Sequence, residues 1–197
     1  MNRLKKRTRL EELERTRTRI LDVAENLFME KGFRAVSTRE IAQHAKVTQP
    51  TLYHHFKDKE TLYMVMIERF VESIQMKMQK VNEGEVADKL ERMLMILSEE
   101  HPSSIMLMVH DLMVEVSEPN KSRIYILWRQ TYLDPFMTIF RELKKEGRLR
   151  THISPEEAAR FCLLTLGQAM LWKNRRKELQ AQFNIYVDII LNGTYIR

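Results

Sequence analysis

Two short segments between Ser37 and Lys59 constrain the fold of this chain more than any other feature. Ser37 is followed three residues later by Glu40, which is the pattern of a capping box at the start of a helix. Thr48 is a good N-cap residue for a second helix, and Pro50 fits the first turn of that helix, where a missing N–H costs nothing. The segment therefore predicts two short helices joined by a tight turn, a helix-turn-helix.

The second of these helices is expected to present polar and aromatic side chains to a partner. Leu52 and Phe56 lie four residues apart, so they share a buried face. Gln49, Pro50 and Tyr53 then lie on the exposed face, where a Gln can bond an adenine edge and the rings can pack on a thymine methyl. The alternative is an ordinary helical hairpin with a solvated polar face. We favour a DNA reader because caps, core spacing and exposed chemistry agree.

Four segments in this part of the chain resemble the N-terminal domain of the TetR family of transcriptional regulators. They are Ala24–Phe28, Lys31–Phe33, Ser37–Ala42 and Thr51–Phe56. The resemblance implies an all-α fold, with a three-helix N-terminal domain and a C-terminal bundle of about six helices. It also implies a homodimer that binds a palindromic operator in double-stranded DNA, most often as a repressor, and is released by a small ligand.

By the same resemblance, ten residues fall on positions that contact DNA bases or the DNA backbone. They are Thr38, Arg39, Thr48, Gln49, Pro50, Thr51, Tyr53, His54, His55 and Lys59. One position departs from the family pattern, because Lys46 stands where the turn usually carries Gly. A positive φ at a non-Gly residue costs on the order of 1 kcal/mol, so we expect a slightly strained turn or a compensating phosphate contact.

Positive charge is concentrated in the N-terminal part of the chain. Residues 1–62 hold 14 Lys and Arg against 9 Asp and Glu, while the remaining residues hold 19 against 18. This asymmetry suits a polyanionic partner for the first part only. Residues 1–10 are strongly basic, and we expect either a solvated tail, which is favoured, or an arm that reaches the minor groove.

Helix is expected throughout, because only 5 Gly and 5 Pro occur among 197 residues. We predict a DNA-binding domain over 1–60 and a ligand-sensing and dimerisation domain over 61–197. Apart from the helix-turn-helix, helices are predicted at about 12–31, 59–81, 85–99, 103–117, 120–147, 154–173 and 176–193.

The C-terminal part is rich in Met and aromatic residues. Such a composition fits a plain helical core or a Met-lined pocket for a hydrophobic ligand, and the family resemblance favours the pocket. The candidate ligand-binding residues are Met93, Met106, His110, Asp111, Met113, Trp128, Tyr132, Phe136 and Met170. His110 on its own is more typical of a satisfied core or surface histidine. If Asp111 and Glu115 line the cavity, a cationic lipophilic ligand is expected.

The last two predicted helices carry an apolar stripe that we interpret as a dimer contact. Its members are Ala158, Cys162, Leu179, Phe183, Tyr186, Val187 and Ile190. Two such helices from each subunit would make a four-helix interface across a twofold axis. The alternative is packing within one chain only.

The sequence argues against several other classes of protein. None of the 6 histidines has Glu three residues before it, so the Glu-x-x-His signature of a di-iron bundle is absent. No Gly-rich phosphate loop or zinc motif occurs, so we expect no catalytic residues, no metal and no cofactor. An all-α enzyme is therefore disfavoured, whereas a ligand-independent DNA-binding protein with an architectural or partner-binding role stays open. A single cysteine and no signal peptide or membrane span suit the cytoplasm.

Overall fold

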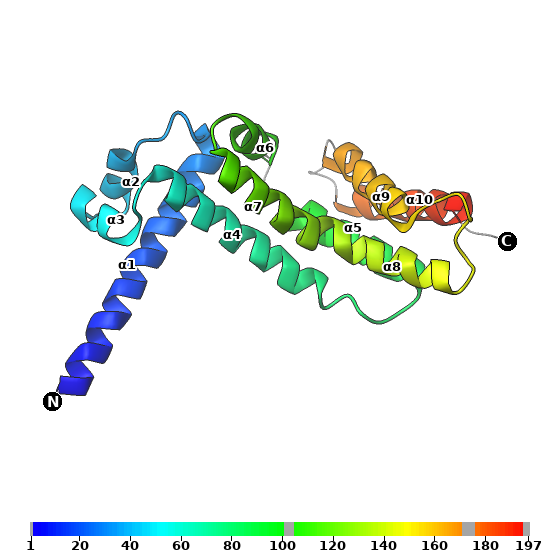
Figure 1. The fold of residues 1–197 in the computed structure, drawn as a ribbon, viewed down its shortest axis with the longest axis horizontal. Coiled ribbons are helices and arrows are strands. Elements are labelled where there is room, and N and C mark those ends of the chain that lie inside the picture. The colour runs from blue at the N-terminus through cyan, green and yellow to red at the C-terminus, as the bar shows by residue number, and fades with distance from the viewer. Residues whose placement is uncertain (1, 101–104, 171–175, 195–197) are drawn as a thin grey trace. The chain divides into compact units, whose positions relative to one another are not determined.

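The structure, a computed structural model, describes residues 2–100, 105–170 and 176–194, and every element in these ranges is a helix (Figure 1). The expected all-α fold is confirmed. The chain divides into two compact units. The first unit combines Met1–Arg69 with Ser104–Lys121, and the second combines Phe70–Ser103 with Ser122–Arg197. The sequence predicts a single boundary between residues 60 and 61. The first unit instead also contains Ser104–Lys121, which lies within the predicted second domain.

The first helix, α1, runs from Asn2 to Lys31, so it begins ten residues before the predicted start. The basic segment expected as a tail is therefore helical in the described residues. Helix α1 buries Ile20, Ala24 and Phe28 on one face, as its helical spacing predicts. Gly32, directly after the helix, has a φ of 82° and donates its N–H to the carbonyl of Phe28 at 2.9 Å.

Local capping chemistry explains the two short helices that follow, α2 (Thr38–His44) and α3 (Gln49–His55). Ser37 Oγ accepts from the N–H of Glu40 at 3.1 Å, and Thr48 Oγ1 accepts from the N–H of Thr51 at 3.2 Å. Both predicted N-caps are confirmed. Lys46, in the turn between the helices, has a φ of 53°, which confirms the expected left-handed conformation.

The core of the first unit is an aromatic cluster beneath the helix-turn-helix. The Tyr63 ring lies 4.9 Å from the ring centroids of both Phe28 and Phe33. Leu52 of α3 and Phe56, which caps the C-terminal end of this helix, are 0% and 2% exposed, so the predicted inner face is confirmed. Helix α6 (Ile105–Val114) packs on α1 within the same unit, and α7 (Glu118–Trp128) starts there.

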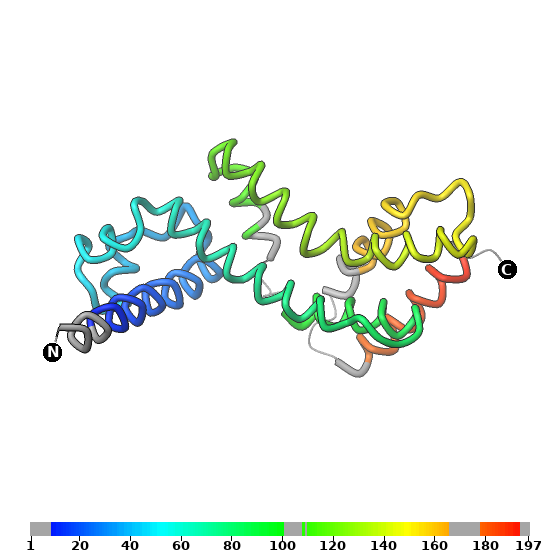
Figure 2. Tube along the Cα trace, turned by 60° about the horizontal axis from the view of Figure 1, so that its bottom comes forward, coloured from blue at the N-terminus to red at the C-terminus, as the bar shows by residue number. Residues whose placement is uncertain are grey.

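In the described residues, the second unit contains the end of α4 (Lys59–Met78), most of α7 and four complete α-helices. These are α5 (Val86–Glu100), α8 (Asp134–Lys145), α9 (Pro155–Met170) and α10 (Arg176–Thr194). Helix α8 packs on α9 and α5 packs on α10, around a core that contains Phe136, Phe140 and Phe183. Figure 2 shows α4 as one continuous helix, which begins in the first unit and ends in the second.

One predicted helix of this region is interrupted. The span 120–147 was expected to be continuous, but it consists of α7, the π-helix η1 (Arg129–Leu133) and α8. At the start of α9 the expected cap is confirmed, because Ser154 and Glu157 each accept from the other's backbone N–H at 3.1 and 2.8 Å. The predicted start of one helix at 103 and the predicted last residues of another, 171–173, lie outside the described residues. No helix in the described ranges is long and apolar enough to cross a membrane.

Candidate nucleic-acid interface

Helix α3 presents a polar and aromatic face to solvent. Gln49, Pro50, Tyr53 and His54 are exposed, and the Tyr53 side chain is 47% exposed although the ring is large. Leu52 on the opposite face is fully buried, which fixes the rotation of the helix about its axis. The four side chains therefore project from a helix that is anchored in the core.

Side-chain hydrogen bonds connect this face to the start of α2. Tyr53 Oη and Thr38 Oγ1 lie 3.0 Å apart, and Gln49 Nε2 donates to the same Thr38 oxygen at 3.5 Å. Arg39, the next residue of α2, is exposed. These contacts bring together Gln49 and Tyr53, which the sequence placed on one face, and Thr38, which lies on another helix. The bonds limit the rotamers available to both side chains before any partner binds.

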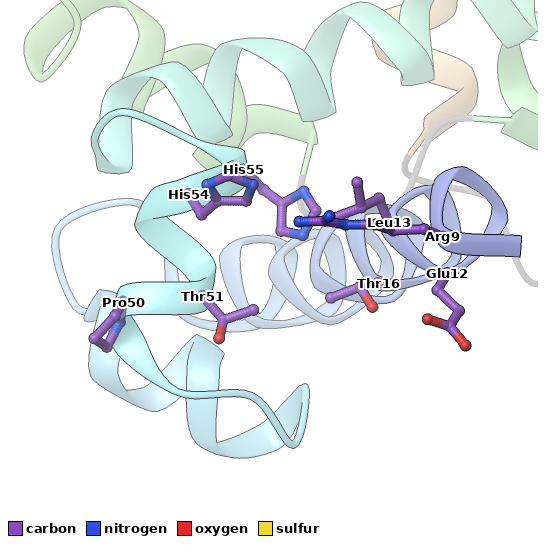
Figure 3. A pocket seen from close by; sticks show the side chains of 8 residues that line it. All are labelled: Arg9, Glu12, Leu13, Thr16, Pro50, Thr51, His54 and His55. Atoms are coloured by element: carbon purple, nitrogen blue, oxygen red, sulfur yellow. The ribbon is translucent and has the colours of Figure 1, made fainter. Parts of the chain in front are cut away.

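A cleft of about 510 Å³ separates α3 from the N-terminal part of α1 (Figure 3). Pro50, Thr51, His54 and His55 line one side, and the sequence-based prediction included all four. The other side is lined by residues of α1 that the prediction missed, namely Arg9, Glu12, Leu13 and Thr16. The basic residues at the chain start were the sequence signal for this side of the cleft. The sequence did not predict that they belong to the same helix as the rest of α1.

His55 has an altered acidity in this cleft. Burial, followed by the positive charge of neighbouring His54 and Arg17, holds its pKa below the usual value of 6.5. The guanidinium of Arg17 also lies 5.3 Å from the centroid of the Phe56 ring, a cation–π distance. A phosphate in the cleft would act against this shift, because a nearby negative charge favours the protonated ring.

Lys59 has a structural role that the sequence did not suggest. Its ammonium donates to the carbonyls of Phe33 and Val36 at 2.7 and 2.8 Å, and it lies 4.2 Å from the Phe33 ring centroid. Burial lowers its pKa, while Glu115 and Asp111 act in the opposite direction. Two of its three donors therefore bind the turn between α1 and α2, and the phosphate contact of Lys59 stays a prediction.

The candidate ligand-binding residues belong to different units. Asp111 lies in the first unit, where it is 4% exposed and accepts from the N–H of Phe33 at 2.6 Å. His110 and Met113, in the same unit, are exposed. The core of the second unit contains Met93, Tyr132 and Phe136, with Trp128 packed against it. The side chains of Met106 and Met170 lie outside the described residues.

The stripe interpreted as a dimer contact faces inward. Its buried members, each at most 5% exposed, are Ala158, Cys162, Leu179, Phe183, Val187 and Ile190, and Tyr186 is half-buried. The six buried residues fill the core of their own unit, which fits the alternative of packing within one chain. The outer faces of α9 and α10 instead expose Phe161, Leu164, Ile185 and Ile189.

Together, the fold and the site define a helix-turn-helix DNA-binding protein with a second helical unit. The family model for "Bacterial regulatory proteins, tetR family" matches residues 20–65. The HTH-type transcriptional repressor KstR2 of Rhodococcus jostii is 30% identical over 187 residues, which cover 90% of each chain. The chain therefore belongs to the TetR family of transcriptional regulators, whose members bind DNA and are regulators rather than enzymes.

Solved structures show the same fold. The ketosteroid transcriptional regulator KstR2 of Mycobacterium tuberculosis is 23% identical with a TM-score of 0.68, and the match covers 92% of this chain and 95% of that one. GusR of Salmonella enterica is 24% identical with a TM-score of 0.67, and the match covers 90% of this chain and 94% of the other. These likenesses extend beyond the residues of the family match into the second unit.

Proposed function

We propose that this protein is a homodimeric transcriptional repressor that binds a palindromic operator through α3 and is released by a small hydrophobic ligand. The observation that carries the proposal is the exposed face of α3, where Tyr53 and Gln49 are held by hydrogen bonds to Thr38. Repression is also the role named for the Rhodococcus relative that matches along 90% of this chain.

In this proposal Gln49, Pro50 and Tyr53 read base edges in the major groove. A Gln amide can donate to and accept from one adenine, and the two rings supply apolar contact for a thymine methyl. The hydroxyls of Thr38 and Thr48, with the exposed guanidinium of Arg39, are suited to phosphate oxygens on either side of the groove. The remaining members of the predicted contact set, Thr51, His54, His55 and Lys59, would flank the groove.

The dimer contact is reassigned to the outer faces of α9 and α10. Leu164 is 72% exposed, and Phe161, Ile185 and Ile189 are each about half exposed. Four large apolar side chains on the exposed faces of two adjacent helices suit a twofold four-helix contact. A dimer would place two copies of α3 in successive major grooves, about 34–36 Å apart. We expect Leu164→Lys to yield a monomer by sedimentation, whereas Arg160→Lys on the same helix should leave the dimer intact.

A cationic ligand is not part of this proposal. It required Asp111 to face a cavity, but this carboxylate is buried against the turn that contains Phe33. A hydrophobic ligand without a required charge is the form that we retain.

Base reading is tested with an operator selected from random DNA by the purified protein. Gln49→Ala and Tyr53→Ala should each weaken operator binding by about 1–3 kcal/mol while leaving random DNA nearly unaffected. Gln180→Ala, at an exposed position on α10, is the matched control and should bind as the wild type does. Equal losses on operator and random DNA would contradict base reading by α3.

A further inference from the structure

The cleft between α1 and α3 offers several groups that can bind a phosphate of the DNA backbone. The guanidinium of Arg9 and the hydroxyl of Thr16 line it on the α1 side, and the hydroxyl of Thr51 with two imidazoles lines it on the α3 side (Figure 3). All of these residues belong to the first unit. Pro50 borders the cleft and also belongs to the exposed face of α3, so a DNA strand bound to that face would run beside the cleft.

The two imidazoles of the cleft, those of His54 and His55, differ in exposure. His54 is exposed, whereas His55 is half-buried. Their ring centroids lie 5.6 Å apart, with an angle of 73° between the ring planes. The ring centroid of His55 also lies 6.4 Å from that of the buried Phe56. His55 thus lies where the core meets the cleft, so its protonation is sensitive to a charge that enters.

His55 faces charges of both signs in the free protein. The charged and titratable groups around it are His54 on its own helix and Arg9, Glu12, Glu14 and Arg17 on α1. Burial, followed by His54 and Arg17, holds the pKa of His55 below its usual value of 6.5, while Glu14 acts in the opposite direction. The ring is therefore mostly neutral at pH 7 when no DNA is bound.

A backbone phosphate in the cleft would change this balance. A phosphodiester carries a full negative charge, and an opposite charge within about 4–6 Å favours the charged form of a titratable group. Its oxygens only accept hydrogen bonds, and the imidazolium of His55 offers two donors where the neutral ring offers one. Because the usual pKa of histidine lies close to neutrality, a modest change in its surroundings is enough to alter its charge.

We propose that the cleft binds one backbone phosphate of the operator between Arg9 and His55, and that His55 takes up a proton from solvent as the complex forms. This inference rests on the proposed function, to which it adds a contact from α1 and a bound proton. Because the complex holds more protons than the free protein, operator affinity should rise as the pH falls through the pKa of His55 in the complex. The rise should level off below the pKa of His55 in the free protein.

The first test is the operator affinity of the full-length protein at about pH 8 and about pH 6, measured by fluorescence anisotropy at constant ionic strength. The affinity of the wild type should increase by at least about fivefold at the lower pH. His55→Gln keeps an amide in the cleft but cannot gain a proton, so it should lose most of this increase. His44→Gln, at an exposed site on α2 outside the cleft, is the matched control and should retain it. A wild-type affinity that does not change with pH, or equal changes in the wild type and His55→Gln, would overturn the proposal.

The second test observes the proton directly. A proton NMR titration of the imidazole Cε1–H should show a higher pKa for His55 in the operator complex than in the free protein, with no such change at His44. Inorganic phosphate at the same ionic strength should leave the titration of His55 as it is in the free protein, because a mobile anion is not held in the cleft by neighbouring contacts. An equal effect of inorganic phosphate would make the cleft a general anion site and overturn its assignment to DNA.

The third test examines the contact from α1. Arg9→Gln should reduce the slope of operator affinity against salt by about one unit. Arg15→Gln, at an exposed position of the same helix outside the cleft, should leave the slope unchanged, and equal reductions in both variants would overturn the phosphate contact. If the wild type selects an operator but binds it independently of pH, only this inference fails. If it selects no operator from random DNA, the proposed function fails.

Discussion

The carboxylate of Asp111 and the backbone amide of Phe33 are joined by a buried hydrogen bond of 2.6 Å, although 78 residues separate them in the sequence. The carbonyl of the same Phe33 accepts from Lys59 at 2.7 Å. Both polar backbone groups of one residue in the turn between α1 and α2 are therefore held by side chains from α6 and α4. The position of the helix-turn-helix within its unit depends on these two remote contacts.

We expect Asp111→Ala to lower the free energy of unfolding by about 1–3 kcal/mol, because it leaves the N–H of Phe33 buried without its acceptor. Asp111→Asn keeps an oxygen at this position and should cost less. Chemical denaturation of both variants measures the difference. Met113→Ala, at an exposed site on the same helix, should stay within about 0.5 kcal/mol of the wild type. Equal effects of the Ala and Asn substitutions would refute the assigned role of the oxygen.

Glu60 makes a second connection to the segment that follows α6. Its carboxylate accepts from Ser117 Oγ at 2.6 Å, from Asn120 Nδ2 at 2.7 Å and from the N–H of Ser117 at 2.9 Å. These bonds, led by that of the Ser117 hydroxyl, hold the pKa of Glu60 below its usual value of 4.5. The ionised form is therefore favoured in the folded state, and its stabilisation is present above about pH 4.5 and lost as the pH falls through the lowered pKa.

We expect Glu60→Gln to destabilise the protein by about 1 kcal/mol at neutral pH, because the charged acceptor is lost. This difference in unfolding free energy should narrow in acid, as the wild-type carboxyl becomes protonated. Unfolding curves at about pH 7 and about pH 3.5 measure this difference. Glu72→Gln, at an exposed site on the same helix, should show no such narrowing. A difference that is independent of pH would mean that the hydrogen bonds do not depend on ionisation.

His55 gives a prediction of the same sign as Glu60, but at higher pH. Its pKa is lowered in the folded state, so the neutral ring is favoured there and the unfolded chain binds its proton first. The wild type should therefore lose stability as the pH falls below about 6.5, and His55→Gln should lose less between about pH 7.5 and about pH 5.5. Thermal unfolding at both pH values provides the comparison. A larger acid loss in the variant would contradict the direction assigned to this pKa.

The sequence predicted those parts of the fold that are determined by interactions between residues close together in the chain. Ser37, Thr48 and Ser154 cap helices through bonds to residues three positions away, so the signal and its effect lie in the same few residues. Leu52 and Phe56 follow from helical spacing alone. The exposed face of α3 follows in turn, because it is the opposite side of the same short helix.

The misjudged parts depend on contacts between distant segments. An apolar stripe such as that of Phe183 and Val187 shows that a face is buried, but not whether the same chain or a second copy covers it. Asp111 looked like a candidate for a ligand because nothing near it in sequence indicates Phe33. The π-helix η1 interrupts the helix predicted over 120–147, and no local pattern in Arg129–Leu133 indicates it.

Lys46 provides the last prediction, because it combines backbone strain with an exposed charge. Among the described residues it is the only non-Gly residue with a positive φ, at 53°. Gly adopts this conformation without steric cost, although it also gains freedom in the unfolded chain. We expect Lys46→Gly to stabilise the protein by roughly 0.5–1 kcal/mol relative to Lys46→Ala, which keeps the strain and removes the charge. Chemical denaturation compares the two variants directly.

The same pair of variants separates strain from DNA contact. If the Lys46 ammonium binds a phosphate, both variants should reduce the slope of operator affinity against salt by about one unit, irrespective of their stabilities. If it does not, both slopes should equal that of the wild type, and only the unfolding free energies should differ. Equal stability of the Gly and Ala variants would show that the turn stores no strain at this residue, whatever its φ.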